Sequence, residues 1–199
     1  LNCETDFVAK NDDFSKLANY FIEFALESSS DSLEDFLKLS YLDSELTISE
    51  KITEQSGVIG EKIEISYFEK VVSKKVVAYN HPGNQIASLV GLTVDSEDIG
   101  KQVAMQVAAM NPIALDQDSV SQDIIDREIE VGKELAIQEG KPLEMAEKIA
   151  KGRLNKFFKE TTLVNQAFIR DNKKSVAQFL KESDPDLMVT SFKRYSLSI

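Results

Sequence analysis

The chain has few side chains that could carry out covalent chemistry. Its only cysteine, Cys3, and its only histidine, His81, have the chemical types of a nucleophile and a base. They are far apart in the sequence, and neither lies in a nucleophile elbow or a glycine-rich phosphate loop. One thiol and one imidazole are also too few ligands for a usual zinc site. We therefore interpret Cys3 as a small core thiol and His81 as a turn residue.

Carboxylates are too common in this sequence to mark a site by themselves. The 199 residues include 34 acidic and 23 basic residues, which gives a net charge of −11. Asp126 and Glu130 lie one helical turn apart, and we interpret them as part of a solvated helix face. Residues 57–60 are too few for a phosphate-binding P-loop and lack its Gly-Lys-Ser/Thr ending. We therefore expect a protein that is not an enzyme and that binds no metal or cofactor.

The composition argues against two other classes of partner. A strongly acidic chain repels both the phosphates of nucleic acids and anionic membrane surfaces. No run of about 18 apolar residues occurs, and the first residues do not have the pattern of a signal peptide. A single cysteine is consistent with a reducing compartment. We therefore expect a cytoplasmic protein that binds neither nucleic acid nor membranes.

One segment near the start of the chain places a large apolar ring among polar groups. Phe7 and Val8 follow Thr5-Asp6 and come just before Asn11, a residue type that caps helices. Both apolar side chains could pack on the first helical turns as a hydrophobic staple. Alternatively, the loop could present Phe7 to a partner, since exposed aromatic anchors often fill a partner's pocket. The local sequence leaves both interpretations open.

Three helices are predicted in the stretch up to about Gly60. The first follows the cap at Asn11 and has apolar residues at three- and four-residue steps along one face. This face consists of Phe14, Leu17, Ala18, Phe21, Ile22 and Ala25. A shorter helix is expected over residues 33–39, and a third near residues 49–55 is expected to end at Gly57.

The hydrophobic pattern changes to that of strands after Glu61. Alternating and β-branched residues predict an antiparallel meander, with a turn at Pro82-Gly83-Asn84. Its strands are expected at residues 63–67, 71–79 and 86–94. A helix then carries Val103, Ala104, Val107 and Ala108 on one face, and Asn111-Pro112 stops it.

The remaining residues predict a helical arm and a return to mixed structure. Residues 119–158 form two narrow amphipathic stripes separated by Gly140-Lys141-Pro142, a pattern typical of an antiparallel, coiled-coil-like hairpin. A short helix is expected at residues 175–181 and an edge strand at residues 187–199.

Together these elements predict an α+β fold: an antiparallel β-sheet core flanked by helices, with a protruding antiparallel helical hairpin. We expect three parts. Residues 1–113 would form the first core subdomain, residues 114–163 the hairpin arm, and residues 164–199 the return to the core.

Several motifs, in order along nearly the whole chain, resemble those of the elongation factor Ts family. The Thr-Asp-Phe-Val core of the first motif is the most specific of them. The matching segments are Asn2-Cys3-Glu4-Thr5-Asp6-Phe7-Val8-Ala9-Lys10, Ile59-Gly60-Glu61-Lys62-Ile63, Ala104-Met105-Gln106-Val107-Ala108-Ala109, Gly140-Lys141-Pro142 and Asn165-Gln166-Ala167-Phe168. The family's amino-terminal domain of ubiquitin-associated type has no counterpart in the sequence given.

The resemblance implies a guanine-nucleotide exchange factor for the translation GTPase elongation factor Tu. In the implied mechanism Phe7 enters an apolar pocket of the G domain, which displaces the segment that helps to hold Mg²⁺ beside the GDP phosphates. The implied primary contacts are Thr5, Asp6, Phe7 and Val8. The implied secondary contacts are Ile86, Ala87, Met105 and Gln106.

Two positions depart from the family pattern. Gln106 stands where the family usually has histidine, and Gly83-Asn84-Gln85 stands where it often has Gly-Gly-Arg. An amide still forms hydrogen bonds, but the basic side chain of the second motif is absent. From the pattern of the residues alone, a protein-interaction or dimerisation module that uses the hairpin is the alternative function, and a homodimer stays open.

Overall fold

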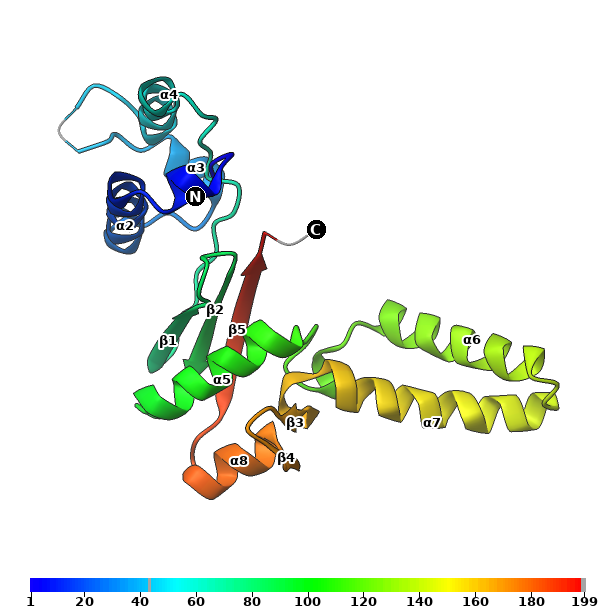
Figure 1. Ribbon diagram of the computed structural model, residues 1–199. Coiled ribbons are helices and arrows are strands. Elements are labelled where there is room, and N and C mark those ends of the chain that lie inside the picture. Colours follow the sequence, from blue (N-terminus) through cyan, green and yellow to red (C-terminus); the bar gives the residue numbers. More distant parts are fainter. Residues whose placement is uncertain (43, 198–199) are drawn as a thin grey trace. The chain divides into compact units, whose positions relative to one another are not determined.

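The computed structural model describes residues 1–42 and 44–197, and its chain forms two compact units, Leu1–Lys70 and Val71–Ile199 (Figure 1). We call them the first and the second unit. Helices combine with antiparallel sheets of three and two strands, so the predicted α+β class is confirmed. In the described part of the chain, no helix is both long and apolar enough to cross a membrane. The division into core, arm and return segment stays a prediction.

The first unit is helical. It contains α1 (Asp6–Ala9), α2 (Asp12–Glu27), α3 (Leu33–Leu37) and α4 (Ile48–Ile59). Their apolar faces meet in one cluster, the first core, whose buried members are Phe14, Phe21, Phe36, Ile48, Ile52 and Ile63. The predicted cap of α2 is confirmed, because the side chain of Asn11 accepts a hydrogen bond from the backbone N–H of Asp13 at 2.7 Å.

Two predictions for the first unit were wrong. The third helix does not end at Gly57 but continues to Ile59, and Gly60 caps it with a φ of 80°, a left-handed conformation that glycine adopts at low cost. Residues 63–67 do not form a strand, and only Glu64 pairs there, in a single bridge with Asn2. The apolar alternation has another cause: Ile63 is buried in the first core, and Ile65 packs against it.

The second unit is built on a three-stranded sheet. Its strands are β1 (Lys75–Asn80), β2 (Ile86–Leu92) and β5 (Val189–Ser196), in the antiparallel order β1-β2-β5. The hairpin of the first two strands is confirmed, although each is shorter than predicted. The third strand is β5, which lies at an edge of the sheet as its sequence predicted. Residues 198–199 of that prediction lie outside the described residues.

Helix α5 (Glu97–Met110) packs on one face of this sheet (Figure 1). Its predicted apolar face is confirmed, since Val103, Ala104 and Val107 are buried with Val77 of β1 and Val90 of β2 in a separate hydrophobic cluster of the second unit. The contact is close enough to require a glycine. A Cβ atom built on Gly100 would lie 2.5 Å from Cγ2 of Val77.

The helical hairpin is confirmed. After a short 3₁₀ turn (Gln117–Ser119), α6 (Gln122–Gln138) and α7 (Leu143–Thr161) run alongside one another and extend away from the sheet (Figure 1). Small residues line the seam between the helices, namely Gly132, Ala136, Ala146 and Ala150. They let the two backbones approach closely, because a Cβ atom on Gly132 would lie 3.1 Å from Cα of Ala150.

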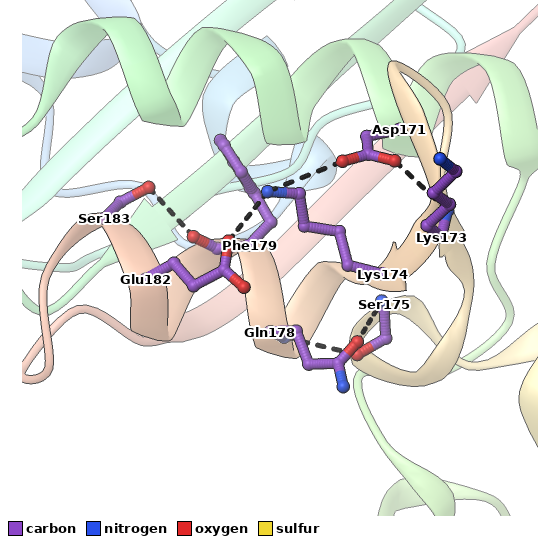
Figure 2. Close-up of polar contacts among 8 residues, drawn as sticks. All are labelled: Asp171, Lys173, Lys174, Ser175, Gln178, Phe179, Glu182 and Ser183. Carbon is purple, nitrogen blue, oxygen red and sulfur yellow. Dashed lines mark hydrogen bonds and ion pairs between the residues drawn. The ribbon is translucent and has the colours of Figure 1, made fainter.

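A group of short elements follows the hairpin. It comprises a 3₁₀ turn (Leu163–Asn165), β3 (Ala167–Phe168), β4 (Asp171–Ser175) and α8 (Val176–Ser183). The helix was predicted, but the two short strands were not. Figure 2 shows how α8 is fixed: Ser175 and Gln178 form a capping box, and Lys174 bonds Glu182 at 2.7 Å.

Candidate partner-binding site

The segment that was singled out in the sequence forms a single helical turn, α1. Thr5 caps this turn, because its hydroxyl oxygen accepts a hydrogen bond from the backbone N–H of Val8 at 3.4 Å. None of the four residues of α1 is buried. We call residues 5–10 the Phe7 turn.

The two apolar residues of the Phe7 turn have different environments. Val8 is half-buried and packs against the first core, as a staple residue would. The side chain of Phe7 is 83% exposed. The staple interpretation therefore describes Val8 and not Phe7, whose ring is available to another molecule. Whether a partner uses it stays a prediction.

Glu61 holds the backbone where the Phe7 turn begins. Its Oε2 accepts hydrogen bonds from the backbone N–H groups of Glu4 at 3.1 Å and Thr5 at 3.0 Å, while its Oε1 accepts one from the Thr5 hydroxyl. The hydrogen bond from the Thr5 hydroxyl, followed by those from the two amides, lowers the pKa of the Glu61 carboxyl. We did not predict this role from the sequence, although Glu61 lies in one of the motifs quoted above.

Asp6 and Cys3 contribute less to the site. The carboxylate of Asp6 pairs with Nζ of Lys10 at 2.6 Å, which lowers the pKa of Asp6, but both side chains are mostly exposed and such pairs stabilise little. Sγ of Cys3 donates to the carbonyl of Thr5 at 3.3 Å. Burial, with the nearby charge of Glu61, raises the pKa of this thiol, which makes it a poorer nucleophile.

The expected secondary contacts all belong to the second unit. Ile86 and Ala87 begin β2, where Ala87 is exposed and Ile86 is half-buried. Met105 is half-buried on α5. These three side chains have surface to offer a partner.

Gln106 is different, because it has no exposed surface. Its Nε2 donates to Oε1 of Gln166 and to the carbonyl of Ala167, each at 3.1 Å, and its Oε1 accepts from the backbone N–H of Ile169 at 2.8 Å. The amide thus ties α5 to the segment around β3. The expectation that Gln106 touches a partner directly stays a prediction. In the structure the side chain is buried, and its donors and acceptor are used inside the second unit.

The other candidate chemical groups have ordinary structural surroundings. Nδ1 of His81 lies 3.0 Å from the hydroxyl of Tyr79, beside the turn between β1 and β2. Asp126 accepts a hydrogen bond from the side chain of Gln122 on the exposed surface of α6. Residues 1–42 and 44–197 contain no group of three or more histidine, cysteine or carboxylate side chains arranged to hold a metal ion.

Comparison with known proteins agrees with the motif resemblance. Residues 4–198 match the family model described as Elongation factor TS. A protein named Elongation factor Ts from Christiangramia forsetii is 53% identical over 200 residues, which cover 99% of this chain and 72% of the relative. Proteins of the same name from Amoebophilus asiaticus and Flavobacterium psychrophilum are 48% and 47% identical, over 98% and 99% of this chain and 71% and 72% of theirs. With a family match over almost its full length, the chain belongs to the elongation factor Ts family.

Proposed function

We propose that this chain is a guanine-nucleotide exchange factor that binds elongation factor Tu in its GDP form and promotes release of the GDP. The observation that carries the proposal is the exposed ring of Phe7, 83% accessible at the centre of the family's Thr-Asp-Phe-Val motif. A large aromatic side chain on a well-held turn is suited to fill an apolar pocket on a partner.

The proposed mechanism is mechanical and electrostatic rather than covalent. Phe7 enters a pocket between two helices of the G domain and displaces the segment that helps to hold Mg²⁺ beside the phosphates. Without the cation the phosphate charges are no longer compensated, so GDP binds more weakly. The coupling is reciprocal: the factor by which this chain weakens GDP is the factor by which GDP weakens the binding of this chain.

The free energy of burying the Phe7 ring shows how much of the coupling and of the interface this residue can provide. Full burial of a phenylalanine side chain stabilises a complex by roughly 1.5–3 kcal/mol, and about 1.4 kcal/mol changes an equilibrium constant tenfold. The ring can therefore provide much of a typical coupling of about 1–3 kcal/mol. It cannot provide the whole interface, for which we propose additional contacts at Ile86, Ala87 and Met105.

The other residues of the primary site have distinct proposed roles. Thr5 caps and orients the turn, Val8 seats it on the first core, and Asp6 offers an exposed carboxylate next to the ring. In this role the chain needs no cofactor and has no catalytic residue. We place it in the cytoplasm, with the GTPase rather than nucleic acid or membrane as its partner.

A second candidate function is an interaction or dimerisation module without exchange activity. It is favoured by a groove of about 520 Å³ on the hairpin, in which Val131, Leu135 and Phe157 lie among charged side chains. Leu135 and Val131 are more than a third exposed there. This surface is compatible with pairing of two chains and does not depend on Phe7.

Release of a fluorescent GDP from elongation factor Tu tests the proposal. We expect the unaltered chain to accelerate release, and Phe7→Ala to slow it by about tenfold or more, since the lost burial exceeds about 1.4 kcal/mol. Leu26→Ala is the matched control, because Leu26 is also a large, exposed apolar residue of the first unit (75% exposed). It should leave the rate unchanged. Binding without acceleration would favour the module, and unfolding of Phe7→Ala would show that the ring is structural.

A further inference from the structure

The start of the Phe7 turn is held by the carboxylate of Glu61, a residue distant in the sequence. Glu61 lies 56 residues from Thr5 and accepts hydrogen bonds from the backbone N–H and the hydroxyl of that residue. A third hydrogen bond comes from the backbone N–H of Glu4. All three donors belong to the two residues immediately before α1.

The backbone on both sides of Glu61 is itself held in place. The left-handed conformation of Gly60 ends α4 just before it. After it, the backbone N–H of Ile63 donates to Oγ of Ser56 at 3.0 Å, and Glu64 pairs with Asn2 through hydrogen bonds of 2.8 and 3.2 Å. The carboxylate is therefore mounted on a fixed part of the first unit.

The Phe7 turn has little other support. A helix of four residues does not hold its own conformation, because a first helical turn costs more entropy than its hydrogen bonds return. The ion pair between Asp6 and Lys10 is exposed and contributes little. Besides the carboxylate of Glu61, the turn is supported by the packing of Val8 on the first core and by the weak hydrogen bond from Sγ of Cys3 to the carbonyl of Thr5.

The hydrogen bonds to Glu61 are of the stronger kind. Among the described residues no lysine or arginine forms an ion pair with Glu61, so its charge is compensated by the two amides and the hydroxyl. Hydrogen bonds to an ionised acceptor are roughly twice as strong as neutral ones. Removing this carboxylate should release the start of the turn while the hydrophobic core stays intact.

We propose that Glu61 is a positioning residue that orders the Phe7 turn before the partner arrives. The inference rests on the proposed exchange function and extends it to a residue that acts through Thr5 rather than by touching the GTPase. Without Glu61 the turn samples other conformations, and only a fraction of molecules presents the ring correctly. The apparent affinity for the partner falls to that fraction of its original value. At saturation the ring is still present, so the maximal exchange rate is retained.

The test measures the rate of GDP release from elongation factor Tu as a function of the concentration of this chain. For Glu61→Ala we expect the half-saturating concentration to rise about tenfold while the maximal rate changes by less than about twofold. Phe7→Ala should also raise the half-saturating concentration, because the ring is missing, but it should in addition lower the maximal rate. Glu61→Gln retains one oxygen for the two amides and should restore part of the affinity. Glu64→Ala is the matched control, because the side chain of Glu64 pairs with Lys62 and not with the turn.

The outcomes separate this inference from the function on which it rests. If the unaltered chain does not accelerate release, the proposed function fails. If it does but Glu61→Ala behaves like the unaltered chain, or lowers the maximal rate as Phe7→Ala does, the positioning role is refuted. Adding Glu61→Ala to Phe7→Ala should change the half-saturating concentration little further, because Glu61 acts by positioning a ring that is already absent. If the effects of the two substitutions on affinity are fully additive, the inference is overturned. Amide hydrogen exchange of Thr5 and Asp6 should accelerate in Glu61→Ala, with an unchanged melting temperature showing an intact fold.

Discussion

Replacing Gln106 with leucine tests whether this residue of the family's α5 motif acts in the fold or at a partner. Leucine has a similar size and opens no large cavity, but it removes the amide that bonds Gln166, Ala167 and Ile169. The Oε1 of Gln166, a residue only 1% exposed, then loses its partner. The carbonyl of Ala167 and the backbone N–H of Ile169 belong to exposed residues and can bond water.

The expected cost follows from the one buried group left unsatisfied, Oε1 of Gln166. An orphaned buried acceptor destabilises by about 1–3 kcal/mol, and the added apolar burial offsets part of this. We expect the free energy of unfolding of the second unit to fall by roughly 1–2 kcal/mol. With a denaturant slope of about 1–3 kcal/mol per molar urea, the unfolding midpoint should fall by roughly 0.5–1 M.

Urea unfolding followed by circular dichroism measures this change, and Gln102→Leu is the matched control. Gln102 is a partly exposed residue of the same helix, so the identical substitution there should change the midpoint little. The exchange rate of Gln106→Leu in dilute buffer, where the protein is still folded, should remain close to that of the unaltered chain. A normal midpoint together with slow exchange would refute the reasoning and assign Gln106 to direct contact.

Gln106→His extends the same test to the residue usual in the family. A neutral imidazole offers one donor and one acceptor, so the loss of stability should be smaller than with leucine. Protonation would place a second donor against the N–H of Ile169, so the folded-state pKa should lie below the unfolded value of about 6.5. The unfolded chain then binds more protons, and the stability of Gln106→His should decrease as the pH falls below about 6.5.

Two further predictions concern packing and pH. Gly100→Ala places a methyl group 2.5 Å from Val77 and 3.0 Å from Leu92, so it should destabilise the second unit by about 1–3 kcal/mol in urea unfolding. Gly152→Ala, on an open helical surface, should instead stabilise by about 0.5–1 kcal/mol, and destabilisation by both would contradict the packing argument. The lowered pKa of Glu61 means that its contribution is present above the unfolded value of about 4.3 and is lost as the pH falls through the lower folded value. Protection of the Thr5 amide, followed by NMR hydrogen exchange, should therefore persist at pH 5 and decline only at more acidic pH, while loss already near pH 6 would contradict it.

Elements specified by local chemistry were predictable from the sequence. The cap at Asn11 and the three- and four-residue spacing after it located α2, because both signals arise within one helix. The break at Gly140-Lys141-Pro142 located the end of the hairpin in the same way, with Gly140 in the left-handed conformation. The charged, helix-forming composition of residues 119–158 was sufficient to predict α6 and α7. Their packing requires only small residues in the seam between the two helices.

Features that depend on contacts between residues far apart in the chain were not predictable. Ile63 and Ile65 alternate like strand residues, but a strand needs a neighbour, and only Asn2 lies alongside at Glu64. β3 has only two residues, and β4 consists of polar residues without the apolar alternation that predicts a strand. The burial of Gln106 was also hidden, because it depends on Gln166, which is 60 residues away in the chain.

The different exposure of Phe7 and Val8 could not be predicted from the sequence and became known only from the structure. Successive residues of a helix point about 100° apart, so a single turn that seats one of these side chains on the core must direct the other elsewhere. The sequence offers two apolar residues and cannot choose between them. The choice depends on the rotational phase of the turn, which is set where the turn begins, at Thr5. Since Glu61 binds both the amide and the hydroxyl of Thr5, it fixes that phase, with Val8 on the core and Phe7 in solvent.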